Sequence, residues 1–94
     1  MAEHLINTDG IEVIIDDDMK KLLRNINVGR PENERIHRIA LRKQLEEYIA
    51  WHEDTMPLEE VATVRFEGNV YVKLEHKDGF WFITGIFEVE ENHA

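Results

Sequence analysis

The sequence contains no cysteine and no serine. Without cysteine the chain has no disulfide framework, no thiolate zinc site and no cysteine nucleophile. Without serine, every mechanism that uses a serine nucleophile is excluded. No stretch approaches the roughly 18 apolar residues that a membrane helix needs, and the N-terminus lacks the basic and then apolar run of a secretory signal. We therefore expect a cytoplasmic protein with no membrane contact.

The length of 94 residues leaves room for one hydrophobic core. Hydrophobic residues make up 43% of the chain and charged residues 33%, which is ordinary globular usage and argues against wholesale disorder. The sequence therefore predicts a single domain over residues 1–94, with flexible ends at 1–8 and 91–94.

The charge is unevenly distributed along the chain. The formal net charge is −9, and all of it lies in residues 44–94, where the only bases are Arg65, Lys73 and Lys77. Residues 19–43 are instead rich in bases. This asymmetry favours oriented association with a second copy or with another protein, although mixed surface charge can also serve solubility alone. The net charge argues against direct nucleic-acid binding by attraction to phosphates.

The first half of the sequence has the pattern strand, helix, helix. Residues 11–15 are β-branched and predict a strand. Asp16–Asp18 provide an N-cap and an acidic first turn for a short helix over Met19–Ile26. Pro31 suits the first position of a second helix, which we expect to be the longest element and to end near Glu53.

The second half predicts three antiparallel strands, at Val61–Glu67, Val70–His76 and Phe80–Glu90. Asp78-Gly79 is a typical hairpin turn, and Gly85 indicates a bulge in the last strand. The fold class that we expect is α+β in the order β-α-α-β-β-β. A three-stranded antiparallel meander would pack against the long helix.

Two elements carry more apolar surface than one layer of packing can cover. At 100° per residue, the long helix has one apolar stripe that contains Ile39 and Trp51, and a nearly opposite stripe that contains Leu41 and Leu45. The last strand is apolar on both faces, and we expect these faces to be Trp81, Ile83, Phe87 and Val89 against Phe80, Phe82, Thr84 and Ile86. This surplus predicts either a second internal layer or a contact between chains, and we favour a homodimer.

No group of residues indicates catalysis or a bound cofactor. Asp16–Asp18 lack the spacing and the glycine of a calcium loop, so capping explains them better than metal binding. The five histidines include no pair at helical metal-ligand spacing. The glycines are isolated, which excludes a phosphate-binding loop. We therefore predict a protein that is not an enzyme, with no cofactor and no metal.

Residues 11–15, the helix over 18–26, the turn at 27–30 and the helix from Pro31 onward resemble the strand-helix-helix order of ribbon-helix-helix DNA-binding proteins. The resemblance covers less than half of the chain. It implies a dimer formed by pairing the first strands, with base readout by outward strand side chains. As an alternative function, it suggests a dimeric transcriptional regulator whose basic segment contacts phosphates through Arg24, Arg30, Arg35 and Arg38.

Our leading hypothesis is a small acidic interaction protein, an inhibitor or adaptor that binds a protein partner. Carboxylates beside aromatic rings can compete for a basic surface, including one that normally holds nucleic acid. The acids that we expect at the contact are Glu59, Glu60, Glu67, Glu75, Glu88, Glu90 and Glu91, and the expected aromatic anchors are Tyr71, Trp81 and Phe87. A further alternative is a small-molecule site between the long helix and the sheet, with Trp51 or Tyr48 in its wall.

Overall fold

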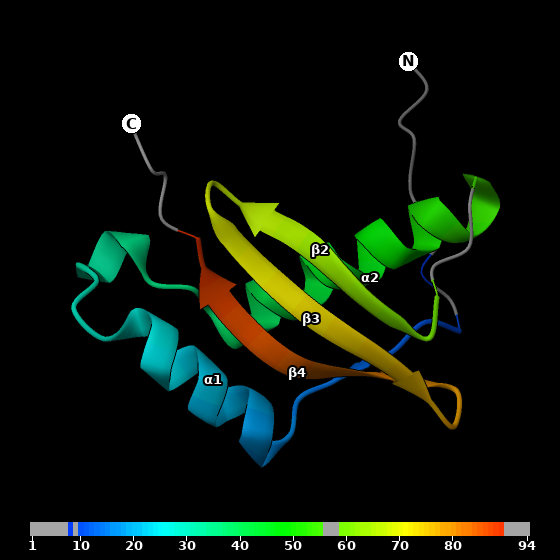
Figure 1. The fold of residues 1–94 in the computed structure, drawn as a ribbon, viewed down its shortest axis with the longest axis horizontal. Helices are drawn as coiled ribbons and strands as arrows, with labels where there is room; N and C mark the ends of the chain where they lie inside the picture. Colours follow the sequence, from blue (N-terminus) through cyan, green and yellow to red (C-terminus); the bar gives the residue numbers. More distant parts are fainter. Residues whose placement is uncertain (1–7, 9, 56–58, 90–94) are drawn as a thin grey trace.

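The computed structural model describes residues 8, 10–55 and 59–89. The predicted α+β class and the order of its elements are confirmed (Figure 1). The expected flexible ends lie outside the described residues, apart from Thr8. The elements are β1 (Val13–Ile14), α1 (Asp17–Asn27), a 3₁₀-helix η1 (Glu32–Glu34), α2 (Arg38–Thr55), β2 (Val61–Glu67), β3 (Val70–Lys77) and β4 (Phe80–Glu88).

One four-stranded mixed sheet organises the molecule, in the order β1-β4-β3-β2. The predicted meander forms its antiparallel part, and β1 adds to it in parallel, with Val13 opposite Trp81. The backbone N–H of Trp81 donates to the carbonyl oxygen of Glu12 at 2.9 Å. The first strand is therefore held beside the last strand of its own chain, whereas in the ribbon-helix-helix arrangement it would pair with a second copy.

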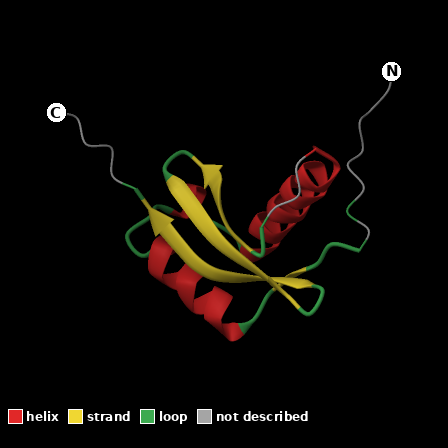
Figure 2. Cartoon of the chain, turned by 45° about the vertical axis from the view of Figure 1, so that its right-hand side comes forward, coloured by secondary structure: helices red, strands yellow, loops and turns green. Residues whose placement is uncertain are grey.

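Helix α2 covers one face of the sheet, and the core lies between them (Figure 2). Leu41, Leu45 and Ile49 recur at helical spacing and are at most 2% exposed. They pack in one cluster with sheet residues such as Val72 and Leu74. The second apolar stripe of the helix is not covered in this way, since Ile39 and Trp51 are 69% and 56% exposed.

Helix α1 lies beside β4 and begins at Asp17, two residues before the predicted start at Met19 and within the aspartates that were expected to cap it. The Asp16 carboxylate accepts a hydrogen bond from the backbone N–H of Met19 at 2.9 Å, which is the expected N-cap. Met19 and Leu23 turn into the core. Helix α1 therefore packs along β4, the strand that pairs with the short strand β1.

The second helix begins seven residues later than Pro31, so the prediction of its start was wrong. Pro31 instead precedes the 3₁₀-helix η1, and Arg35 is extended, with ψ 139°. The cause is the side chain of Asn27, which hydrogen bonds both the N–H and the carbonyl oxygen of Ile36. Those backbone groups are therefore unavailable to a continuous helix.

The bulge in β4 lies at Thr84 and changes which residues share a face. Lys73 pairs with Gly85 and Leu74 pairs with Ile83, so Thr84 has no partner in the register. Ile86 consequently joins the core face of Trp81 and Ile83, and Phe87 turns to the opposite face, where it stacks on Tyr71. The expectation that Phe87 shares a face with Trp81 was wrong, because the extra residue reverses the alternation.

Candidate binding surface

The face of the sheet opposite α2 is the candidate functional site, and we call it the outer face. Alternation along each strand and the register between strands define its members. In Figure 1 this face is turned toward the reader, with α2 behind the sheet. Its residues are Val61, Thr63 and Arg65 of β2, Tyr71, Lys73, Glu75 and Lys77 of β3, and Phe80, Phe82, Gly85 and Phe87 of β4.

Two stacked rings form the aromatic part of the outer face. Tyr71 and Phe87 are opposite each other in the register, with ring centroids 6.0 Å apart and an interplanar angle of 17°. Arg65 is opposite Tyr71 on the other side, and its Nε donates to the carbonyl oxygen of Gly68 at 2.7 Å. Phe87 remains 43% exposed. Two predicted anchors are thus brought together, and they offer a preformed apolar contact to another molecule.

The charge of the outer face is opposite to that of the segment from which it is built. Arg65, Lys73 and Lys77 are the three bases of residues 44–94, and all three lie on this face. Glu75 is the one acid among the strand residues named for this face. The surface is therefore locally cationic, although residues 44–94 account for the whole net charge of the chain.

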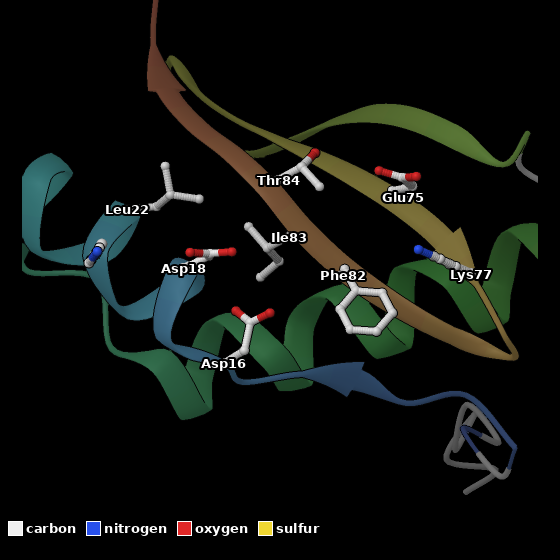
Figure 3. Close-up of a pocket in the computed structure, with 9 residues that line it drawn as sticks. Asp16, Asp18, Leu22, Glu75, Lys77, Phe82, Ile83 and Thr84 are labelled. Atoms are coloured by element: carbon white, nitrogen blue, oxygen red, sulfur yellow. The ribbon is translucent and has the colours of Figure 1, made fainter.

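A cleft at the side of the outer face separates β4 from α1 and has a volume of about 520 Å³. Leu22, Phe82 and Ile83 provide its apolar lining. Figure 3 shows Phe82 and Thr84 on β4 and Leu22 on α1 at the two sides of this space. The charged lining residues are Asp16, Asp18, Lys21, Glu75 and Lys77. Because Phe82, Glu75 and Lys77 also belong to the outer face, the cleft and that face are continuous.

The predicted acids do not form one surface. Glu59 and Glu60 precede β2, at the end of the sheet where Glu75 lies, since Glu75 is opposite Val61. Glu67 and Glu88 lie at the other end, where they line one shallow depression together, and Glu88 forms an ion pair with Arg30 at 3.0 Å. The seven residues of β2 separate the two groups by about 20 Å. Glu90 and Glu91 lie outside the described residues.

Trp81 cannot act as an exposed anchor in this structure. Its side chain is 3% exposed and belongs to the core, where it stacks on His76 with centroids 4.5 Å apart. The two helix residues that were expected to line a small-molecule site are also elsewhere. Trp51 is largely exposed, and Tyr48 is half-buried against the ring of His52. Neither residue lines the cleft beside β4.

The basic residues of the first half are dispersed. Arg30 is ion-paired with Glu88, and Arg35 is exposed in the segment before α2. Arg24 and Arg38 line a second depression, together with Lys20 and His37, between α1 and the start of α2. The four arginines expected to contact phosphates therefore do not form a single row.

Sequence reasoning missed Arg65, Lys73 and Phe82 as parts of the site. The signal was present in the period-two alternation, which places Lys73 with Tyr71 and Arg65 across from it. Summing charge along the chain hid this signal, because the sum mixes the two faces of each strand.

No family model, curated protein or solved structure matches this chain. Within the described part of the chain, no three histidine or acidic side chains gather closely enough to hold a metal ion. The described helices also include none that is long and apolar enough to cross a membrane.

Proposed function

We propose that this protein is a non-enzymatic inhibitor or adaptor that binds a protein partner through the outer face of its sheet. The observation that carries the proposal is the stack of Tyr71 and Phe87, which stands partly exposed beside Arg65. Aromatic and arginine side chains are the residue types that contribute most to protein interfaces. A stacked pair is already ordered, so little conformational entropy is lost when a partner packs on it.

The charges of the outer face indicate the chemistry of the partner. Arg65 and Lys73 lie beside the stack, and Lys77 lies at the other end of the face with Glu75 between them, so a surface with carboxylates around apolar side chains is the best complement. The cleft beside β4 can accept one bulky apolar side chain against Leu22 and Phe82. The described acids lie in two separated groups, which favours the aromatic face over an acidic surface as the main contact.

The test compares two exposed apolar positions. We expect Phe87→Lys to lose a partner that the wild type captures from cell extract, with an affinity for the purified partner reduced about 30-fold. The matched control is Val28→Lys, because Val28 is 75% exposed and lies at the end of α1, away from the outer face. Capture of the same proteins by the wild type and by both variants would refute the proposal.

Single-stranded nucleic acid is the alternative occupant that the same experiment must separate. Bases can stack on exposed rings beside cations, and such binding tolerates many sequences. The net charge of −9 opposes it. Labelled oligothymidine and oligouridine should therefore show no change in fluorescence anisotropy with the wild type. A change that Phe87→Lys abolishes would replace the protein partner with a nucleic acid.

A further inference from the structure

The two edges of the sheet differ in what lies against their backbone groups. At one edge, the N–H of Val13 donates to the Glu46 carboxylate at 3.0 Å, so this outward donor of β1 is capped by a side chain from α2. At the other edge lies β2, which is seven residues long and has β3 as its one neighbour among the described strands. A long edge strand presents backbone groups on which another strand can pair.

The hydrogen-bond pattern identifies which backbone groups of β2 point away from the sheet. The N–H of His76 donates to the carbonyl oxygen of Glu60 at 2.7 Å. Because hydrogen-bonded and non-bonded pairs alternate in an antiparallel ladder, Ala62 and Val64 also bond to β3. The N–H and carbonyl groups of Val61, Thr63 and Arg65 therefore point to the open edge.

We propose that a second copy of the chain pairs antiparallel with this edge, β2 against β2, around a two-fold axis at Ala62. In this register Val61 of each copy is opposite Thr63 of the other, and their outward N–H and carbonyl groups form hydrogen bonds. The two sheets then join into one of eight strands, and the two outer faces become continuous.

Charge favours this register over the one in which the axis lies one residue further along β2. With the axis at Ala62, Glu59, which lies two residues before β2, would come opposite Arg65 of the other copy, and symmetry makes this pair twice. A shift that places the axis at Thr63 would set Glu59 opposite Glu67, and like charges directly opposite each other are unfavourable. The side chain of Gln44 donates to the carbonyl oxygen of Phe66 at 2.9 Å, so the end of β2 beyond Arg65 is occupied by α2 and lies outside the paired segment.

Helix α2 provides a second reason for a copy at this edge. In Figures 1 and 2 its C-terminal end extends beyond β2, outside the sheet. Trp51 lies in the C-terminal part of α2 and is 56% exposed. A second copy at the β2 edge would occupy the space beside this extension and would cover apolar surface of the helix.

The primary test is molar mass by light scattering over a range of concentrations. We expect the wild type to approach twice the 11.1 kDa of the chain. Thr63→Pro should remain at the mass of one chain, because proline removes an N–H that points to the open edge and leaves the ladder with β3 intact. Thr63→Val keeps that N–H and should behave as the wild type. Cooperative thermal unfolding of Thr63→Pro verifies that it is folded.

Two outcomes would overturn the proposal. One is a wild type that has the mass of one chain at every concentration, and the other is a folded Thr63→Pro variant that still dimerises. The first leaves the outer-face contact with a protein partner standing, so the failures of the two proposals are distinguishable.

Cysteine substitution tests the register, since the chain has no cysteine of its own. Ala62→Cys should form a disulfide-linked dimer on oxidation, because the two Cα atoms would be about 4.5 Å apart, within disulfide range. Thr63→Cys should not, because its two copies are offset by two residues. Cross-linking of Thr63→Cys alone would contradict the register.

Charge reversal tests the pairing of Glu59 with Arg65. Arg65→Glu should weaken the dimer, and the added change Glu59→Arg should restore it. No recovery would contradict the charge pairing.

Discussion

At the residue scale, Asn27 determines how the chain passes from α1 to α2. Its amide nitrogen donates to the carbonyl oxygen of Ile36 at 2.9 Å, and its amide oxygen accepts from the N–H of Ile36 at 2.8 Å. One side chain therefore satisfies both backbone groups of a residue that is 5% exposed.

We expect Asn27→Ala to lower the free energy of unfolding by about 2 kcal/mol, because both groups lose their partner. Urea unfolding measures this loss, and Asn33→Ala, at an exposed position, should change it by less than about 0.5 kcal/mol.

Glu46 has a comparable role at the edge formed by β1. One of its carboxylate oxygens accepts from the N–H of Val13 and from Nε of Arg42, each at 3.0 Å. The side chain is 16% exposed, so these charge-assisted bonds are partly shielded from water. We expect Glu46→Ala to lower stability by about 1.5–3 kcal/mol and to accelerate hydrogen exchange at the Val13 amide.

Amide exchange followed by NMR measures the effect at Val13 directly. Glu53→Ala is the matched control, because Glu53 is an exposed glutamate on the same helix. An exchange rate at Val13 that is the same in both variants would show that the carboxylate does not hold β1.

At the scale of the element, the two apolar stripes of α2 differ in how far they are buried. Leu45 is 2% exposed and packs against the sheet, whereas Ile39 is 69% exposed. We expect Leu45→Ala to cost about 2–5 kcal/mol of stability, and Ile39→Ala to change it by less than about 0.5 kcal/mol. Thermal unfolding of the two variants measures the difference. Equal losses would indicate that Ile39 is covered in solution by another chain or by another part of this one.

The elements show where sequence patterns suffice and where they fail. The strands β2 and β3 are predictable because each alternates strictly and ends at a glycine-containing turn. The start of α2 is not, because it depends on Asn27, nine residues before the backbone groups that it binds. The faces of β4 are misassigned after Gly85 for a related reason. The expected faces follow an uninterrupted alternation, and the extra residue at Thr84 exchanges the inner and outer side chains of everything that follows it.

At the scale of the whole molecule, Arg30 joins three segments at one end of the fold. Its guanidinium donates to the carbonyl oxygens of Ile26 and Glu34 and to the carboxylate of Glu88. These partners belong to α1, η1 and β4. We expect Arg30→Lys to lower stability by about 1–2 kcal/mol, because a lysine ammonium cannot match the planar fork of donors.

Urea unfolding of Arg30→Lys should be compared with that of Arg35→Lys, a change of the same kind at an exposed position. A loss that is equal in both variants would mean that the charge alone matters and that the geometry of the fork does not.

The place of each side chain in the folded sheet explains why the candidate site was only partly predictable. Tyr71 and Phe87 could be identified from residue type, and the structure stacks them. Trp81 has the same residue type, but it is buried because it lies on the inner side of β4. The seven acids were grouped by their position in the sequence, and the sheet then separates the described ones to its two ends. Proximity along a strand does not predict proximity on a surface when the strand is seven residues long.

The parallel pairing of β1 with β4 has a consequence for synthesis on the ribosome. Val13 is made early, but its neighbour Trp81 follows it 68 residues later in the chain (81 − 13). Both helices therefore emerge before the surface that buries Met19, Leu41 and Leu45 exists. These side chains stay without that cover in the nascent chain until the meander is made, so the sheet can close only after β4 has emerged.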